Sequence, residues 1–343
     1  MSHELIKLDG SDGEGGGQVL RTALAMSTVT KKSMIIENIR ANRPNAGLAR
    51  QHLAGLHLIR DICQATVSGD HIGSKCVKFE PGEIQHGEYS LDVGTAGSVT
   101  LVLQTVLPTL ASVEGKSTIT MRGGTDVKWA PPVDYYKMML FPILKSMGLE
   151  CTIEVETRGY FPKGGGKITF RIISKGHMEP LKLDAFSDVQ KITGVVNITS
   201  LPVKIAERVK DSALEALSED LRKLADISIE HKDRGPSQGV GIVLAATDGK
   251  GILGADCLGE RGKPAEKVGQ DAVRELMVEI EGGASVDLHL SDQLLPFLAL
   301  AGGSYSARKL TGHAGTNVKT IEKFLGPVIE VEESERVRFK ASK

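Results

Sequence analysis

The stretch LDVGTAGSVTLVLQTVLPTL, residues 91–110, decides the fold prediction because a glycine turn joins a strand pattern to a helix pattern. Residues 91–93 lead into the turn, and an apolar run at helical spacing continues to Leu110. Gly94 and Gly97 stand in the turn, where glycine adopts backbone conformations that other residues avoid. The stretch therefore predicts the start of a β-α-β unit.

The same arrangement stands about 80 residues earlier, where residues 8–26 read LDGSDGEGGGQVLRTALAM. In both units a strand follows (33–39 and 117–121), then a turn with arginine (Arg40 and Arg43; Arg122) and a second helix (48–62 and 133–147). A third copy is predicted after Glu281, with a strand at 286–290 and helices at 292–300 and 317–324. We therefore expect three units of β-α-β-α-β type.

The stretch between the second and third units predicts a small α/β element of its own. Its expected strands are 192–198, 227–231, 240–246 and 252–258, and its expected helices are 204–224 and 264–280. The predicted fold class is α/β (α+β): three tandem βαβαβ-type repeats form a large domain, with a small α/β domain inserted before the third. The predicted boundaries are 1–180, 181–280 and 281–343. One continuous sheet domain is the alternative.

Composition excludes several classes of protein. The chain has 343 residues, 42 Lys+Arg against 43 Asp+Glu and a net charge of −1, which argues against a generally basic nucleic-acid binder but allows a local basic site. The four cysteines form no C-x-x-C pair, which is typical of a reducing cytoplasm. No apolar run approaches a membrane span, and the first residues carry no secretory signal. We expect a cytoplasmic protein that does not enter a membrane.

The 39 glycines cluster at turns, but they do not form a familiar phosphate loop. The dinucleotide pattern G-x-G-x-x-G fails because Gln18 stands at the third glycine position counted from Gly13. The pattern G-x-x-x-x-G-K-[ST] fails at Gly262 because Pro264 follows the lysine. A nucleotide site of another design stays open, since any glycine loop at a helix N-terminus offers N–H groups to an anion.

Two side chains in glycine-rich turns are candidates for chemistry. His313 lies in the run 309–317, KLTGHAGTN, where small neighbours let an imidazole approach a phosphate and Arg308 and Lys309 can hold an anion. A surface-loop histidine is the alternative. Glu14 lies inside the first glycine cluster and can hold a divalent cation beside phosphates. The alternative is an acid favoured by the helix dipole.

Two basic stretches are candidates for binding phosphate. The first contains Arg40, Arg43, Arg50, Gln51 and His52, and arginine forks suit a terminal phosphate. The second, residues 157–175, has five basic residues and no acid, and its Arg158 and Lys163 lie next to glycines. Both stretches can contact a nucleic-acid backbone. An ordinary solvated surface is the alternative.

These residues carry a resemblance to a known family. The stretch RGYFPKGGGKI, residues 158–168, resembles the signature of the RNA 3′-terminal phosphate cyclases. Further blocks are similar to that family in the same order: 14–18 with Arg21, Arg43-Pro44 with 47–48 and 51–53, 123–127, 130–135, 258–262, 289–293 and 313–317. The resemblance runs from about residue 5 to 335.

The resemblance implies an ATP-dependent reaction that converts the 3′-terminal phosphate of an RNA to a 2′,3′-cyclic phosphate. The histidine matching His313 would carry AMP, and Mg²⁺ or Mn²⁺ would lie near Glu14. The implied ATP contacts are Gln104, His289, Leu290, Ser291, Asp292 and Gln293. The candidates for binding the RNA phosphate are Arg21, Arg40, Arg43, Arg50, Gln51 and His52. The expected partners are ATP and an RNA with a 3′-phosphate, and a homo-oligomer stays open.

Two other functions remain as alternatives. A ribosome-biogenesis branch resembles the cyclases but lacks the nucleophile, and the intact sequence around His313 argues against it. An enolpyruvyl transferase shares the repeat type, but its chemistry needs neither a nucleophilic histidine nor the block at 158–168.

Overall fold

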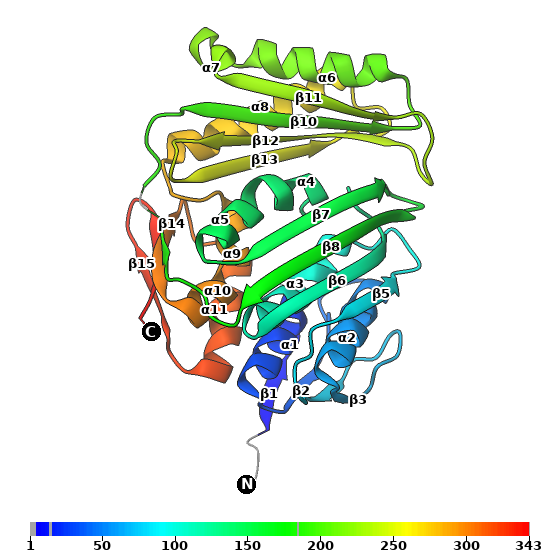
Figure 1. The fold of residues 1–343 in the computed structure, drawn as a ribbon, viewed down its shortest axis with the longest axis vertical. Coiled ribbons are helices and arrows are strands. Elements are labelled where there is room, and N and C mark those ends of the chain that lie inside the picture. Colours follow the sequence, from blue (N-terminus) through cyan, green and yellow to red (C-terminus); the bar gives the residue numbers. More distant parts are fainter. Residues whose placement is uncertain (1–4, 14–15, 184, 343) are drawn as a thin grey trace.

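The computed structural model describes residues 5–13, 16–183 and 185–342, which form two bodies that lie one above the other in Figure 1. The lower body has one hydrophobic core that draws on both ends of the chain, from Ile6 to Ala341. The upper body has a second core between Phe186 and Leu276. Val243 and Ala245 of the upper body belong to the lower core, so an apolar contact joins the two bodies.

Three four-stranded sheets of the lower body share one strand order. In each sheet the first two strands pair in parallel and the other two follow in antiparallel directions. The first sheet runs β1 (Ile6–Asp9), β2 (Met34–Glu37), β4 (Val77–Glu80), β3 (Thr66–Ser68). The second runs β5 (Glu88–Asp92), β6 (Glu114–Gly123), β8 (Gly166–Lys175), β7 (Glu150–Thr157). The third runs β9 (Leu181–Lys182), β14 (Gly303–Ala307), β16 (Val337–Ala341), β15 (Ile329–Glu333).

Helices connect these strands, and those that follow the glycine turns meet inside the lower body. The first sheet has α1 (Gln18–Thr30) and α2 (Arg50–Cys63); the second has α3 (Val99–Ala111), α4 (Val133–Tyr135), the π-helical turn η1 (Tyr136–Leu140) and α5 (Phe141–Ser146); the third has α9 (Leu288–Gln293), α10 (Leu295–Ala301) and α11 (Gly312–Leu325). α1 packs against both α3 and α11, so segments far apart in sequence lie side by side. Apolar residues at helical spacing, such as Val19, Leu20, Ala23 and Leu24, are buried in this packing.

The upper body is a fourth sheet covered by helices. Its strand order is β11 (Ala225–Lys232), β10 (Lys191–Thr199), β12 (Gly239–Thr247), β13 (Ile252–Leu258), and its helices are α6 (Val203–Ala216), α7 (Glu219–Lys223) and α8 (Ala265–Gly282). α6 and α8 pack against each other and against this sheet.

Two predicted elements are wrong. Residues 286–290 form no strand: α9 begins at Leu288, because the Asp287 side chain accepts hydrogen bonds from the N–H groups of His289 and Leu290 and starts a helix there. The first strand of the third sheet is instead β9, which precedes the upper body in the sequence. The single helix predicted over 204–224 is two helices, because the chain leaves α6 at Leu217 and Ser218 caps α7.

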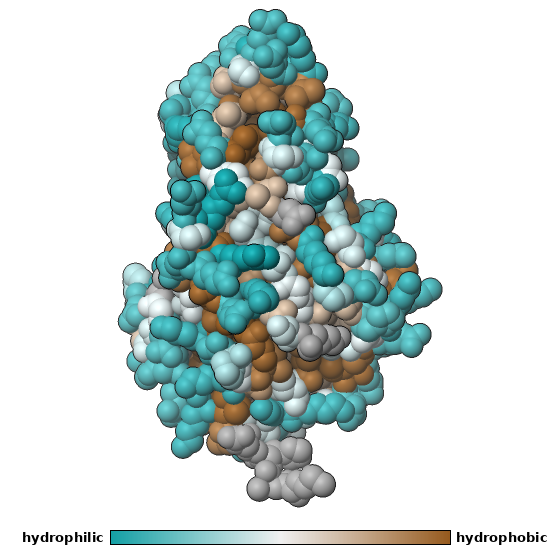
Figure 2. Space-filling view, turned by 90° about the vertical axis from the view of Figure 1, so that its left-hand side faces the viewer, coloured by the Kyte–Doolittle hydropathy of each residue, from teal (hydrophilic) through white to brown (hydrophobic). Residues whose placement is uncertain are grey.

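The four cysteines are free thiols. No helix in the described part of the chain combines the length and the apolar character that crossing a membrane requires. Figure 2 shows that the face on the left of Figure 1 is largely hydrophilic, with apolar residues visible between the polar ones mainly in the lower half.

Candidate active site

His313 is the second residue of α11 and lies at the open end of that helix. Thr311 caps the helix, and its hydroxyl accepts a hydrogen bond from the N–H of Ala314 at 3.0 Å. The His313 side chain is 47% exposed, so a substrate can reach the ring. Its Nδ1 atom lies 3.9 Å from Oδ2 of Asp292, which is too far for a hydrogen bond but close enough for a strong electrostatic interaction.

Asp292 faces His313 from α9 and is almost fully buried. Burial raises the pKa of Asp292 to about 6, although the nearby His313, His289 and Arg21 oppose that shift. The carboxylate is therefore mostly ionised at neutral pH and gains a proton in mildly acidic solution. An ionised carboxylate beside an imidazole stabilises a positive charge that forms on the ring.

Asn317 holds the helices of this site together. Its amide oxygen accepts hydrogen bonds from Nε2 of Gln18 at 2.9 Å and from the hydroxyl of Thr22 at 2.6 Å, both on α1. Its amide nitrogen donates to the backbone carbonyl of Asp292 at 2.9 Å. Asn317 is fully buried, so these bonds fix α11 to α1 and to α9 and set the position of His313, one turn away.

Arg21 extends this polar network from α1 to α3. Its Nε donates to Oε1 of Gln104 at 3.0 Å, and its guanidinium also donates to Gln18. Burial lowers the pKa of Arg21 to about 10, so the side chain stays positive at neutral pH. The predicted phosphate contact Arg21 and the predicted ATP contact Gln104 thus lie together in the same network.

The glycine loop before α1 lies against α2 and α11. A Cβ atom at Gly17 would lie 2.2 Å from Nε2 of His52, and one at Gly13 would lie 2.0 Å from the hydroxyl of Thr316. Only glycine therefore lets the loop approach both helices. Gly17 also precedes α1 and provides no side-chain cap, so the first N–H groups of this helix have no capping side chain as a hydrogen-bond partner.

The start of α2 brings a neutral histidine to this loop. Burial, together with the positive charges of Arg21 and Arg40, lowers the pKa of His52 to about 3. Its Nδ1 accepts a hydrogen bond from the N–H of Ala49 at 3.3 Å, so the proton lies on Nε2, which faces Gly17. Nε2 is therefore a hydrogen-bond donor directed at the loop.

The other predicted phosphate contacts differ in what they do. Arg43 is exposed, and its guanidinium would lie 3.3 Å from a Cβ atom at Gly16. Arg50 is exposed beside Gly94. Arg40 instead donates hydrogen bonds to the backbone carbonyls of Asn45 and Gly47, and these bonds stabilise the loop that contains it. Gln51 accepts a hydrogen bond from the N–H of Ser98 at 2.7 Å and so connects α2 to the start of α3.

The predicted ATP contacts are divided between a cavity and the core. The cavity at the Arg21 network has a volume of about 10 Å³, which is the space of about one water molecule. It is lined by Gln18, Arg21, Thr22, Ala25, Gln104, Leu107, Pro108, Tyr136, Leu140, Asp292, Gln293, Pro296, Phe297 and Asn317. Gln293 has a buried Oε1 atom with no hydrogen-bond partner in the described part of the chain. Leu290 and Ser291 are fully buried outside this lining, and the exposed His289 ring packs edge-on against Tyr135 at 6.4 Å.

Glu14, the predicted metal ligand, lies outside the described residues. Within the described ranges, no three His, Cys, Asp or Glu side chains group together as metal ligands.

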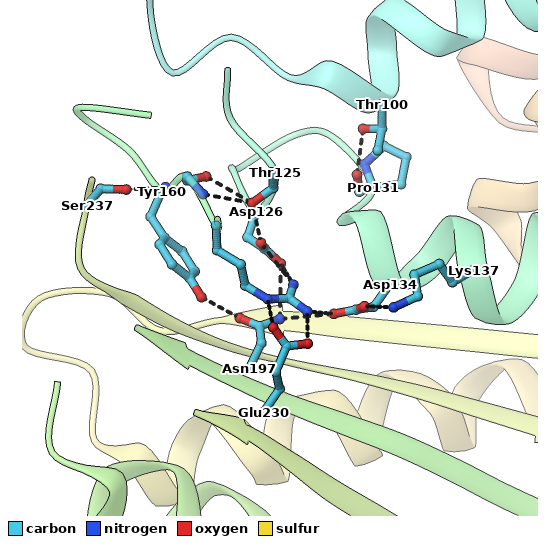
Figure 3. Close-up of polar contacts among 12 residues, drawn as sticks. Thr100, Thr125, Asp126, Pro131, Asp134, Lys137, Tyr160, Asn197, Glu230 and Ser237 are labelled. Atoms are coloured by element: carbon cyan, nitrogen blue, oxygen red, sulfur yellow. Dashed lines mark hydrogen bonds and ion pairs between the residues drawn. The ribbon is translucent and has the colours of Figure 1, made fainter. Parts of the chain in front are cut away.

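Arg158 does not contact solvent, so its predicted role on a nucleic-acid backbone is wrong. It is 1% exposed, and its guanidinium lies 3.2 Å from Asp126, 2.7 Å from Asp134 and 2.7 Å from Glu230. Figure 3 shows these carboxylates gathered with Asn197, which the Tyr160 hydroxyl approaches from the other side. Glu230 and Asn197 belong to the upper body, so this buried cluster joins the two bodies.

The site also contains residues that the sequence alone did not single out. Thr22 and Tyr136 line the cavity, and Asp126, Asp134 and Glu230 surround Arg158. Thr22 lies one helical turn after Gln18, a spacing that places both on the same face of α1. No spacing in the sequence connects Asp126 to Glu230.

Comparisons with known proteins agree along nearly the whole chain. The family model described as RNA 3′-terminal phosphate cyclase matches residues 12–331. The RNA 3′-terminal phosphate cyclase of Sulfolobus acidocaldarius is 44% identical over 322 residues, which cover 94% of this chain and 95% of that protein. The protein of that name from Thermococcus kodakarensis is also 44% identical, over 330 residues that cover 96% of this chain and 95% of that protein. The one from Saccharolobus solfataricus is 44% identical over 338 residues, which cover 98% of this chain and 99% of that protein.

A solved structure, the enolpyruvyl transferase NikO from Streptomyces tendae, aligns with 98% of this chain and 48% of that chain. Its TM-score is 0.38 and its sequence identity is 10%, which is too little to carry an argument. The family model and the curated relatives agree on one conclusion. The chain belongs to the RNA 3′-terminal phosphate cyclase family.

Proposed function

We propose that this protein is an ATP-dependent RNA 3′-terminal phosphate cyclase that works through a covalent histidine–AMP on His313. The observation that carries the proposal is the position of His313. It is exposed at the start of α11, 3.9 Å from the Asp292 carboxylate. Thr316 of the same helix lies against Gly13 of the glycine loop, and Arg43 and His52 lie against Gly16 and Gly17. The helix that carries the candidate nucleophile and the candidate phosphate-binding groups thus contact one loop.

In the first step, a nitrogen of the neutral His313 ring attacks the α-phosphorus of ATP. A P–N bond forms, the bond to the bridging oxygen breaks, and pyrophosphate leaves. The imidazole becomes positively charged as the bond forms, and Asp292 stabilises this charge. Arg43 and the uncapped N–H groups at the start of α1 bind phosphate oxygens.

In the second step, an oxygen of the RNA 3′-phosphate attacks the phosphorus of the histidine–AMP. The P–N bond breaks, His313 is regenerated, and the RNA carries an activated 3′-diphosphate linkage to adenosine. In the third step, the adjacent 2′-hydroxyl attacks the RNA phosphorus, loses its proton and displaces AMP. The product is a 2′,3′-cyclic phosphate. Arg43, Arg50 and the Nε2–H of His52 are the proposed contacts of the RNA phosphate.

The remaining assignments belong to this proposal. The proposed ATP contacts are Gln104, His289, Asp292 and Gln293, with the orphaned oxygen of Gln293 as a hydrogen-bond acceptor. Leu290 and Ser291, fully buried, hold this segment in the core. Mg²⁺ or Mn²⁺ bound near Glu14 would supply positive charge to the triphosphate. We further propose that the three sheets of the lower body are copies of one repeat, that the upper body is an inserted domain, and that the protein works in the cytoplasm. The strand order shared by the three sheets supports the repeat, and the position of β9 ahead of the upper body supports an insertion within the third copy.

Transfer of label from ATP tests this proposal. Protein incubated with ATP labelled at the α-phosphate and with Mg²⁺ should acquire label that is labile to acid and stable to alkali, as a phosphoramidate is. His313→Ala should abolish the label, whereas His57→Ala, a matched change on the outside of α2, should keep it. The wild type should also convert a 3′-phosphate RNA to a phosphatase-resistant product only when ATP is present. Undiminished label on His313→Ala would refute the proposal.

A further inference from the structure

A large cleft lies between the two bodies, and the proposed reaction does not use it. Its volume is about 1210 Å³, which exceeds the range of about 300–1,000 Å³ that is usual for small-molecule sites. Four loops line it: residues 126–130, residues 160–163, residues 235–240 and residues 258–263. The first two belong to the lower body and the last two to the upper body. A cleft of this size suits a polymer.

Two exposed aromatic rings line this cleft. Trp129 is 94% exposed and Phe161 is 76% exposed, and no other aromatic side chain in the described part of the chain is a large exposed hydrophobic residue. Trp129 also has a φ of 60°, a conformation that is strained for a bulky residue. The lower-body loop therefore presents the ring to solvent at an energetic cost.

The charges around these rings favour an anion. Lys128, Lys163, Arg261 and Lys263 line the cleft together with the acids Asp126 and Glu260. Asp126 is held by Arg158, Glu260 lies 2.7 Å from Lys128, and Lys263 pairs with Asp271. Lys163 and Arg261 are exposed and make no ion pair with any described residue. Two uncompensated positive charges thus stand beside two flat apolar surfaces.

The cleft reaches the proposed site of the RNA phosphate. Gln51 and Ser98 line it, and they are hydrogen-bonded to each other at 2.7 Å. Gln51 lies between Arg50 and His52 at the start of α2. A chain whose terminal phosphate is bound at α2 can therefore continue into the cleft.

We propose that this cleft binds the single-stranded RNA that precedes the 3′-terminal phosphate, with bases stacked on Trp129 and Phe161 and backbone phosphates near Lys163 and Arg261. The inference rests on the proposed function and adds the path of the substrate. Aromatic rings beside basic side chains are the usual means of binding single strands regardless of sequence, since every base has a flat face. An acidic peptide would interact with the positive charges but would not stack on the aromatic rings.

The chain provides its own probe, because Trp129 is its single tryptophan. RNAs with a 3′-phosphate and a length of two or eight nucleotides are titrated into the wild type without ATP, and tryptophan fluorescence is recorded. The eight-nucleotide RNA should quench the emission and bind more tightly than the dinucleotide. Equal quenching by polyglutamate, or no quenching by the longer RNA, would overturn the inference.

Variants test the stacking directly through the anisotropy of a labelled RNA. Trp129→Ala and Phe161→Ala should each weaken binding of the eight-nucleotide RNA roughly tenfold. Trp129→Phe should retain most of the affinity because it keeps a ring. Ile72→Ala, which also removes an exposed apolar side chain but lies outside the cleft, should bind as the wild type does. Unchanged affinity of both alanine variants would overturn the inference.

Labelling of the wild type by ATP alone separates the two proposals. If labelling succeeds while fluorescence and affinity do not respond, the cleft assignment fails and the proposed function stands. If labelling fails while the longer RNA still quenches Trp129 and depends on both rings, the cleft assignment stands and the reaction must be reconsidered.

Discussion

At His313, the imidazole and the Asp292 carboxylate come from α11 and α9, which are separated in the sequence by the helix α10 and the strand β14. The two side chains are close because Asn317, one turn after His313, is hydrogen-bonded to the backbone of Asp292 itself. The charge of Asp292 therefore acts on the ring from a fixed position. Its raised pKa then makes the pair sensitive to mild acid.

We expect labelling of His313 by ATP to slow as the pH falls through about 6. The folded-state pKa of Asp292 is raised to about 6, so the carboxylate is charged above this pH and loses its charge below it. His289, Arg21 and His313 face the same carboxylate and keep its pKa from rising further. Asp292→Asn should reduce the labelling rate at pH 7.5 by roughly 10- to 100-fold. The labelling rate of this variant should also fall less steeply in acid than that of the wild type, because the variant has no carboxyl group at position 292 to gain a proton.

Labelling rates between pH 5 and 8.5, compared with urea unfolding at the same pH values, check this prediction. If Asp292→Asn keeps the wild-type rate and pH profile, Asp292 has no part in labelling.

At the scale of elements, Asn317 connects three helices through buried hydrogen bonds to Gln18, Thr22 and the backbone of Asp292. Asn317→Ala leaves the amide of Gln18, the hydroxyl of Thr22 and the carbonyl of Asp292 without this partner. We expect the free energy of unfolding to fall by about 2–4 kcal/mol, since each buried unsatisfied group costs about 1–3 kcal/mol and some will relax. Labelling should fall as well, because α11 loses its contact with α9.

Thr320→Ala is the matched control for this change. Thr320 is buried on the same helix, but its hydroxyl donates only to the carbonyl of Thr316 within that helix. Urea unfolding should show a loss of less than about 1 kcal/mol, with labelling retained. Equal losses in the two variants would show that Asn317 does no more than fill space.

The helices of the first two sheets could be predicted from the sequence because their apolar spacing is regular and glycine marks where they begin. α9 could not, since Val286, Leu288 and Leu290 alternate with polar residues as in a strand, and only the hydrogen bonds of Asp287 show that a helix starts. The short β9 has two residues, too few for any pattern. It pairs with β14, more than a hundred residues later.

The residues of the candidate site could likewise be predicted only in part from the sequence. Motif resemblance brought His313, Asp292, Arg21 and Gln104 to attention, and they lie close together. The basic stretch at 157–175 led to the wrong role for Arg158, because a basic residue next to glycine in a loop is typical of a surface. The acids that bury Arg158 come from separate parts of the chain, so only the folded structure reveals them.

At the scale of the whole molecule, Arg158 neutralises acids contributed by both bodies. Burial raises the pKa of Asp126, and the positive charge of Arg158 opposes that rise. Arg158→Met should therefore leave Asp126, Asp134 and Glu230 facing one another with only Lys137, 3.3 Å from Asp134, as a cation. We expect a loss of about 3–5 kcal/mol of unfolding free energy near pH 8.

The loss should be smaller at pH 5. Without Arg158 the folded-state pKa of Asp126 rises further above the unfolded value, so its protonated form is favoured in the folded state, and stability is lost as the pH increases. Urea unfolding at pH 5 and pH 8 measures this difference. Arg171→Met, an exposed arginine on β8 that pairs with Glu154, should cost less than about 1 kcal/mol at either pH. A pH-independent loss in Arg158→Met would contradict the prediction.

The contact between α1 and α11 also has a consequence for the time at which the protein becomes active during synthesis. Gln18 and Thr22 emerge from the ribosome among the first residues, but their partner Asn317 is made some three hundred residues later. The upper body pairs only strands between Lys191 and Leu258, so it can fold while the rest of the chain is still being translated. Once folded, it shortens the effective loop between β9 and β14 and eases their pairing. A nascent chain therefore carries a finished upper body well before it carries a complete candidate site, and any product released before α11 lacks both His313 and Asn317.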